Sequence, residues 1–82
     1  MEIIIALFAG LADRFGTSRL TFTTTEASVT VDQLKEILTE NYPAAASLIA
    51  VSFVAVNQEY ARGEVLITST DEVALIPPVS GG

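Results

Sequence analysis

The sequence predicts an α+β fold in which a mixed β-sheet wraps over one main helix. Two observations carry this prediction. Short strand-like runs of apolar residues alternate with a single longer segment of helical periodicity, and that segment follows directly after a first pair of strands. The chain has 82 residues, of which 50% are hydrophobic, enough for one small domain with its own core. We expect a domain over residues 1–76 and an extended tail over residues 77–82.

The first quarter of the chain predicts a hairpin that is interrupted by a short helix. Residues 2–9 are rich in β-branched and aromatic side chains, which favours a strand. Residues 10–15 are expected to form a short helical turn closed by Gly16, a residue type common just after helices. Residues 19–23 alternate polar and apolar side chains, so they predict a second strand that returns antiparallel to the first.

The main helix is expected to begin after Thr30. Thr30, with Gln33 three residues later, matches the capping-box pattern of a helix N-terminus. Tyr42 before Pro43 predicts the end, because a residue that precedes proline resists the α conformation. Between these signals, apolar residues recur at helical spacing and form one stripe. The stripe consists of Val31, Leu34, Ile37 and Leu38.

The second half of the chain predicts another short helix and three strands. Residues 44–50 are expected to be helical, and residues 51–56 to form a strand buried on both faces and therefore central in the sheet. A polar loop at 62–70 is expected to carry Val65 and Leu66 towards the core. This order of elements is the β-grasp (ubiquitin-like) arrangement. The remaining predicted elements are a turn at 57–58, a brief edge strand at 59–61 and a last strand at 73–76.

Strand alternation predicts an apolar patch on the outer face of the sheet. One face should cover the helix, whereas the other is usually polar. Neither face is polar in the first and last strands, so some apolar side chains are expected to remain on the outer face, where such a patch usually marks a partner site. The alternative is that they lie under a loop or the short helix. The candidates are Phe8, Tyr60, Ala74 and Ile76.

The composition excludes several function classes. The chain has no cysteine and no histidine, so no disulfide, thiolate nucleophile or common zinc site is expected, and conventional catalysis by this chain alone is not expected. The net charge of −6 argues against binding to nucleic acid or anionic membranes and suits a partner with a basic surface. Because no export signal or membrane-spanning segment is recognised, we expect a cytoplasmic protein.

The residues from Pro77 to Gly82 predict a chemically active end. The Pro77-Pro78 pair favours extended geometry, whereas Gly81 and Gly82 carry no side chain and can enter a channel that excludes side chains. Fully extended, this segment spans roughly 20 Å. An activating enzyme could then convert the Gly82 carboxylate to an acyl-adenylate. The alternative is a disordered tail or a cloning remnant.

The end of the sequence resembles a known family. Residues 71–82, Asp-Glu-Val-Ala-Leu-Ile-Pro-Pro-Val-Ser-Gly-Gly, resemble the C-terminus of the MoaD-like family, the small sulfur carrier subunits of molybdopterin synthase. Residues 7–9, Gly16 and residues 55–60 resemble the same family at matching positions, so the likeness covers essentially the whole chain. The proline pair before Val-Ser-Gly-Gly is its most specific element, because a diglycine end alone also occurs in ubiquitin-like modifiers and in the thiamine sulfur carrier.

The resemblance implies a function in molybdenum cofactor biosynthesis. The Gly82 carboxylate would be adenylated by an E1-like, MoeB-like adenylyltransferase and then converted to a thiocarboxylate. The sulfur would pass to the cyclic pterin precursor (precursor Z) bound by a MoaE-like large subunit. Glycyl adenylate and 1-thioglycine at Gly82 would therefore be transient modifications, and no bound cofactor or metal is expected.

The resemblance also implies partners and contact residues. A heterotetramer of two small and two large subunits is expected. The family places partner contacts at positions that match Phe8, Tyr60 and Ile76. Asp71 and Glu72 are expected mainly to form a turn, although they could also pair with basic residues of a partner. The implied contacts continue along the tail through Pro77, Pro78, Val79 and Ser80 to Gly81 and Gly82.

Two other functions remain open from the sequence. The chain could be a different ubiquitin-like carrier, serving thiamine synthesis, tRNA thiolation or conjugation to proteins. It could also be a non-catalytic β-grasp binding module whose terminal glycines have no chemical role. A deletion that affects only molybdoenzymes would separate the first possibility from molybdopterin synthesis. Extension of the chain beyond Gly82 would separate the second, because only a carrier needs a free terminal carboxylate.

Overall fold

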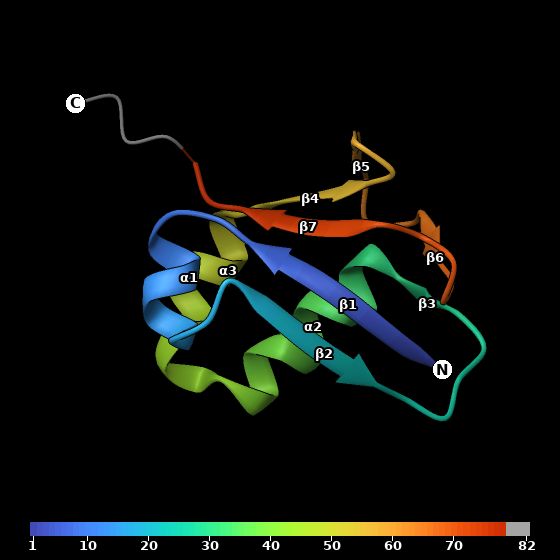
Figure 1. Ribbon diagram of the computed structural model, residues 1–82, viewed down its shortest axis with the longest axis horizontal. Coiled ribbons are helices and arrows are strands. Elements are labelled where there is room, and N and C mark those ends of the chain that lie inside the picture. The colour runs from blue at the N-terminus through green and yellow to red at the C-terminus, as the bar shows by residue number, and fades with distance from the viewer. Residues whose placement is uncertain (79–82) are drawn as a thin grey trace.

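A five-stranded mixed sheet forms the centre of the computed structural model, which describes residues 1–78 (Figure 1). The strand order is β2-β1-β7-β4-β5; β1 and β7 are parallel, and the other neighbours are antiparallel. The predicted mixed sheet and its main helix are therefore confirmed. The strands are β1 (Glu2–Leu7), β2 (Arg19–Thr23), β4 (Phe53–Val56), β5 (Glu59–Ala61) and β7 (Val73–Ile76).

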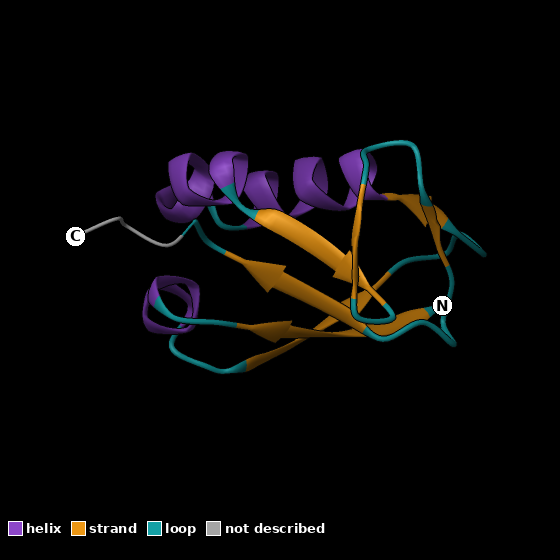
Figure 2. Cartoon of the chain, turned by 90° about the horizontal axis from the view of Figure 1, so that it is seen from above, coloured by secondary structure: helices purple, strands orange, loops and turns teal. Residues whose placement is uncertain are grey.

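The helices lie mainly on one side of this sheet. Figure 2 shows α2, η1 and α3 as a layer along the sheet, with α1 set apart at one end. This leaves most of the opposite sheet face without a helix above it. The helices are α1 (Gly10–Phe15), α2 (Val31–Asn41), the 3₁₀ turn η1 (Pro43–Ala45) and α3 (Ala46–Val51).

The main helix α2 begins and ends where the sequence predicts. The Thr30 hydroxyl accepts a hydrogen bond from the Gln33 N–H at 3.1 Å, and the Gln33 side-chain oxygen accepts one from the Thr30 N–H at 2.8 Å. Both bonds of the capping box are therefore present. At the other end, the Tyr42 N–H donates to the Leu38 carbonyl at 2.9 Å before Pro43 starts the 3₁₀ turn.

The core lies between the inner face of the sheet and the helices. Ile3, Ile5 and Leu7 of β1 are buried, and so are Val73 and Leu75 of β7, as strand alternation predicts. Helices α1, α2 and α3 add apolar side chains from the other side. These are Leu11, Val31, Leu34, Leu38 and Ile49.

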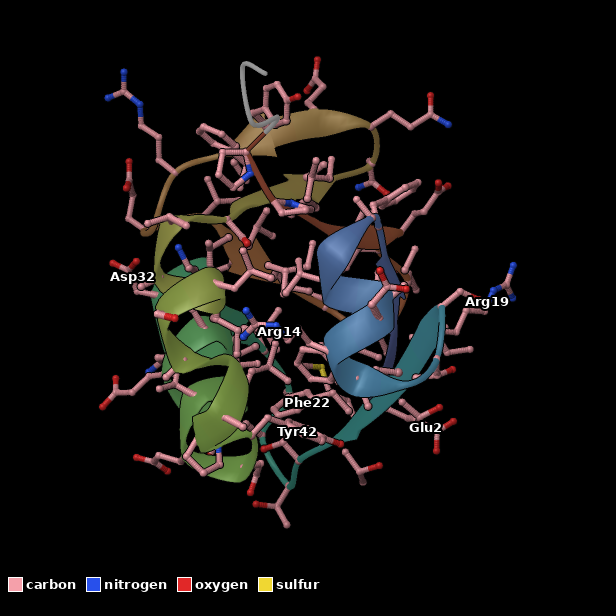
Figure 3. The ribbon with its side chains drawn as sticks, turned by 90° about the vertical axis from the view of Figure 1, so that its left-hand side faces the viewer. Glu2, Arg14, Arg19, Phe22, Asp32 and Tyr42 are labelled. Atoms are coloured by element: carbon pink, nitrogen blue, oxygen red, sulfur yellow. The ribbon has the colours of Figure 1, made fainter. Side chains whose placement is uncertain are left out.

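Helix α1 is joined to η1 by contacts that include a charged side chain. Arg14 points from α1 towards the neighbouring helical segments, and its guanidinium donates to the Ala44 carbonyl at 3.3 Å (Figure 3). The rings of Phe15 and Tyr42 pack with their centroids 4.5 Å apart. Gly16 ends α1 in the left-handed conformation at φ 73°, which confirms its predicted role, because glycine adopts this conformation without a Cβ clash.

The strand expected at residues 51–56 differs from the prediction. Val51 ends α3, and β4 begins only at Phe53 and lies second from the edge, while β7 takes the centre. Val54 and Ala55 are buried, but Phe53 is 53% exposed, so burial on both faces is wrong for the start of the strand. The reason is that Val54 faces the core, so alternation turns Phe53 to the opposite face of the sheet, most of which has no helix above it (Figure 2).

The loop expected at 62–70 contains a strand that the sequence reading missed. Strand β6 (Leu66–Ile67) pairs antiparallel with β3 (Val29–Thr30) in a separate two-stranded sheet. Its register places Ile67 opposite the buried Val29, so Ile67 enters the core and Leu66 points outward with 60% of its surface exposed. The expected burial of Leu66 is therefore wrong, since alternation at β6 turns Ile67 inward instead. The expected burial of Val65 is wrong as well, because this residue precedes β6 and is 37% exposed.

Within residues 1–78, no helix has the length and apolar character needed to cross a membrane. The same part of the chain contains no group of three or more His, Cys, Asp or Glu residues positioned to hold a metal ion.

Candidate docking surface

Small residues form a shallow row across the outer face of the sheet. In the observed registers, Ala74 of β7 pairs with Ala6 of β1 and with Ala55 of β4, and Ala55 pairs in turn with Tyr60 of β5. Ile76 of β7 pairs with Phe53 of β4 in the next outward-facing row. Larger side chains thus lie around a row of alanine residues, which makes this face concave.

Phe8, Ala55, Tyr60, Ala74 and Ile76 line one pocket of about 340 Å³ on this face, with Gln58 and Glu72 at its margin. We call the first five residues the outer patch. Phe8 is 50% exposed and Tyr60 is 73% exposed, so both keep large apolar areas in contact with solvent. The structure therefore brings together the four residues that alternation predicted for a shared patch. Their suggested contact with a partner stays a prediction.

Phe53 is a further member of this surface that sequence reasoning missed. Its ring lies 5.5 Å from the Tyr60 ring, measured between centroids, and it is the cross-strand neighbour of Ile76. The prediction of a strand buried throughout residues 51–56 excludes Phe53 from such a surface. A signal was available, since Phe53 and Ala55 share one face by alternation, but the sequence does not reveal which face of the sheet the helices cover.

The end of β7 meets the outer patch. The Phe8 N–H donates to the Leu75 carbonyl at 3.3 Å, which holds the start of the β1–α1 connection against this strand. Ile76 follows as a patch residue, Pro77 is buried and Pro78 is exposed. The described chain therefore ends beside the patch. The other predicted site residues, Val79, Ser80, Gly81 and Gly82, lie outside the described residues.

A hydrogen-bond network anchors the β4–β5 turn to the start of β7. The Asn57 N–H donates to the Glu72 carbonyl at 2.7 Å, and the Asn57 side-chain oxygen accepts from the Glu72 N–H at 2.9 Å. The Asn57 side-chain NH₂ also donates to the Asp71 carboxylate at 3.0 Å. This network fixes the hairpin that carries Tyr60.

Asp71 is held by its own turn as well. Its carboxylate accepts a hydrogen bond from the Thr68 N–H at 2.7 Å and a longer one from the Thr68 hydroxyl at 3.3 Å. These bonds favour the ionised form: the Thr68 N–H, followed by the Asn57 side chain, lowers the pKa of Asp71. Asp71 therefore has the structural role that the sequence predicted for it.

Two turns with unusual backbone angles border the outer patch. Within residues 1–78, the non-glycine residues with positive φ are Ala9 at 50°, Asn57 at 54° and Gln58 at 69°. Ala9 directly follows Phe8, and Gln58 lies at the patch margin. Such conformations cost on the order of 1–3 kcal/mol and persist only where the surrounding structure holds them. Here the Leu11 N–H, which donates to the Phe8 carbonyl at 3.1 Å, and the Asn57 network supply that restraint.

The arrangement suits binding better than catalysis. In the outer patch, aromatic and aliphatic side chains surround alanine residues. Surfaces of this composition are typical of contacts with protein partners. The described residues around it include no nucleophile and general base placed together. Any chemistry at this end of the molecule would therefore depend on groups beyond Pro78 or on a partner.

Sequence comparison identifies relatives along the whole chain. A model of the ThiS family matches residues 5–82. A molybdopterin synthase sulfur carrier subunit of Chlamydomonas reinhardtii is 36% identical over 84 residues and covers 100% of both chains. One from Arabidopsis thaliana is 32% identical over 82 residues, which are 100% of this chain and 84% of that protein. The match to the Dictyostelium discoideum subunit is 54% identical over 43 residues, or 50% of each protein.

Solved structures agree with the fold. Small archaeal modifier protein 1 from Haloferax volcanii has a TM-score of 0.82 and 28% identity, with 100% of both chains covered. A chain in the complex of subunits 1 and 2 of the molybdopterin-converting factor from Helicobacter pylori has a TM-score of 0.68 and 18% identity, also with 100% of both chains covered. At this identity the second likeness shows the fold alone. Together they confirm the predicted β-grasp fold.

Proposed function

The chain belongs to the ThiS family and is related over its full length to molybdopterin synthase sulfur carrier subunits, and we propose that it is the sulfur carrier subunit of a molybdopterin synthase. The observation that carries this proposal is the position of the outer patch. The patch includes Ile76, which is followed in the sequence by the proline pair and then by Val-Ser-Gly-Gly. A partner that covers the patch is therefore well placed to receive the end of the chain.

In this proposal Gly82 is the reacting residue. Its carboxylate attacks ATP in an E1-like enzyme, releasing pyrophosphate and forming the glycyl adenylate. A sulfur donor then displaces AMP and leaves a thiocarboxylate, 1-thioglycine. The sulfur passes to the cyclic pterin precursor in the large subunit, and hydrolysis of the acyl group by water returns the carrier to its carboxylate form. The family match runs through Gly81 and Gly82, which supports this assignment.

The carrier contributes position, while its partners contribute the catalytic groups. Docking at the outer patch fixes one end of a short segment, so that the Gly82 carboxylate is held near a reacting group instead of diffusing freely. Pro77 and Pro78 limit the conformations of this segment because proline fixes φ. The heterotetramer of two small and two large subunits and the cytoplasmic location stay predictions.

The direct test is the mass of the intact protein after incubation with the activating enzyme, ATP and a sulfur donor. We expect the mass to rise by the difference between one sulfur and one oxygen atom, with the change located in a C-terminal peptide that contains Gly82. A variant with one alanine added after Gly82 is the control, and it should show no change. An unmodified wild-type protein under conditions that thiolate a known carrier would contradict the proposal.

Conjugation to other proteins is a second candidate function. It is favoured by the 28% identity to small archaeal modifier protein 1 over the full length of both chains. Both functions use an activated C-terminus, so the extension variant does not separate them. The separating measurement is a deletion strain of the source organism: loss of molybdoenzyme activity supports the sulfur carrier, and loss of covalent protein adducts supports the modifier.

A further inference from the structure

The charged residues of the outer sheet face are distributed unevenly. The outer patch, at the Pro78 end, is apolar, whereas a second hollow of about 390 Å³ at the other end of the face contains charged side chains. Three carboxylates and one guanidinium line this second hollow, so its formal charge is negative. They belong to Glu2, Asp71, Glu72 and Arg19.

Glu72 is the acidic residue that borders both hollows. It lines the charged hollow and the margin of the outer patch, as alternation with Ala74 and Ile76 along β7 requires. Its side chain is exposed. Within residues 1–78, no hydrogen bond or ion pair engages its carboxylate, and only its backbone bonds to Asn57.

The structure thereby shows different roles for Asp71 and Glu72, two neighbouring acidic residues that the sequence alone does not distinguish. Asp71 uses its carboxylate within the protein, where it accepts hydrogen bonds from Thr68 and Asn57. Glu72 keeps its carboxylate free at the edge of an apolar surface. A charge in that position is partly desolvated when a partner covers the patch, so it favours a partner that supplies the opposite charge.

We propose that Glu72 is a specificity-determining residue of the docking surface, and that the partner which covers the outer patch places a lysine or arginine opposite it. The inference rests on the proposed function, because it takes the large subunit as the occupant of the patch. Arg19 lies on the same face, since it pairs with Ala6 across β1 and β2, and it lines the charged hollow with Glu72. Arg19 therefore weakens the attraction of this face for a basic partner.

Removal of the charge at Glu72 and at Arg19 should change the affinity for the large subunit in opposite directions. Glu72→Gln keeps the size of the side chain and removes its charge, so the dissociation constant for the purified large subunit should rise about two- to fivefold at low salt. Glu72→Lys places like charges together and should weaken binding more strongly, by about tenfold or more. Arg19→Gln should tighten binding, because it removes the positive charge that opposes the partner.

The measurement is a titration of the full-length chain with the purified large subunit, at low salt and again near 1 M salt. High salt should reduce the differences in dissociation constant between the variants, since the Debye length is then only about 3 Å. Glu64→Gln is the matched control, because it removes one exposed negative charge from outside both hollows and should bind like wild type. Thermal melts should show that each variant remains folded.

Phe8→Asp separates failure of this inference from failure of the proposed function. If Phe8→Asp abolishes binding while Glu72→Gln, Glu72→Lys and Arg19→Gln all bind like wild type, the outer patch is the docking site and the assigned role of Glu72 is wrong. If wild-type protein does not bind the large subunit, or folded Phe8→Asp binds normally, the proposed docking is wrong and the role of Glu72 is overturned with it.

Discussion

Phe8 shows how one apolar residue can serve binding more than folding. It follows three buried side chains of β1, yet half of its own surface is exposed at the outer patch. Phe8→Asp should therefore fold normally and lose binding to the large subunit, because docking would leave an unpaired charge in a desolvated contact. A central contact of this kind is worth about 2 kcal/mol or more. Ile76→Asp should behave in the same way.

Ile4→Asp provides the matched control for these two variants. Ile4 lies on the same face of β1 and is 54% exposed, but it lines the charged hollow and lies outside the outer patch. It should keep most of the binding affinity. Circular dichroism and titration with the large subunit measure the two properties separately. If Phe8→Asp or Ile76→Asp unfolds while Ile4→Asp does not, the substituted residues belong to the core and the patch has no separate role.

Asp71 gives a prediction about pH. Hydrogen bonds from Thr68 and Asn57 lower the pKa of Asp71, so the ionised carboxylate stabilises the folded state at neutral pH. This contribution is present above the ordinary aspartate pKa of about 3.9 and is lost as the pH falls through the lower pKa of the folded state. Asp71→Asn should therefore melt below wild type at pH 7, and the difference should shrink in strong acid.

Melting temperatures at pH 7 and near pH 2 test this expectation. Asp13→Asn is the comparison, because it changes the net charge equally at an exposed position on α1. A difference between wild type and Asp71→Asn that stays the same at both pH values would show that the carboxylate charge does not stabilise this turn.

At the scale of elements, the N-terminus of α2 is built together with the loop that precedes β6. The Asp32 N–H donates to the Gly63 carbonyl at 3.0 Å, and the Val31 N–H donates to the Val65 carbonyl at 3.0 Å. Two backbone donors that a helix start leaves unpaired are thereby satisfied. The loop approaches so closely that a Cβ atom at Gly63 would lie 2.2 Å from the Asp32 carboxylate.

Gly63→Ala should therefore destabilise the fold. The added methyl group must displace the exposed Asp32 carboxylate from its place at the start of α2, and the loss of that interaction with the helix N-terminus costs about 0.3–1 kcal/mol. The free energy of unfolding, measured by chemical denaturation, tests this. In an Asp32→Ala background the same substitution should cost clearly less, because the opposing carboxylate is gone. If Gly63→Ala lowers the free energy of unfolding equally in both backgrounds, the effect comes from the loop backbone and not from the contact with Asp32.

At the scale of the whole molecule, folding and the proposed chemistry depend on different regions. The buried side chains lie between the helices and the inner sheet face, whereas the outer patch lies on the other face beside Pro78. The residues proposed to react follow Pro78 in the sequence. Substitutions in that last segment should consequently affect activity with little effect on stability, in contrast to substitutions in the core.

Gly81→Val tests this separation. Stability should change by no more than about 0.5 kcal/mol, because Gly81 has no side chain for the substitution to remove. Sulfur transfer should nevertheless stop, since a β-branched side chain adds bulk beside the reactive carbonyl and restricts the backbone. Thiocarboxylate formation and product turnover with both purified partners, beside a melting curve, measure the two effects. Wild-type turnover would mean that the receiving channel does not require a bare backbone.

Local signals in the sequence determined the fold class and much of the element order. The capping box of Thr30 and Gln33, the proline that ends α2 and the glycine that closes α1 act within a few residues, so each can be recognised without knowing the rest of the fold. The same holds for the diglycine end, whose proposed chemistry depends on the absence of side chains.

Only the tertiary structure decided which residues share the outer face and which acidic side chain there keeps its carboxylate available to a partner. The exposure of Phe53 depends on the placement of the helices mainly on the other side of the sheet (Figure 2), and the inward position of Ile67 depends on its register with Val29. The different roles of Asp71 and Glu72 depend on Asn57, which reaches them from another hairpin. Strand register and contacts between distant segments join residues that are far apart in the chain, so no local pattern in the sequence encodes them.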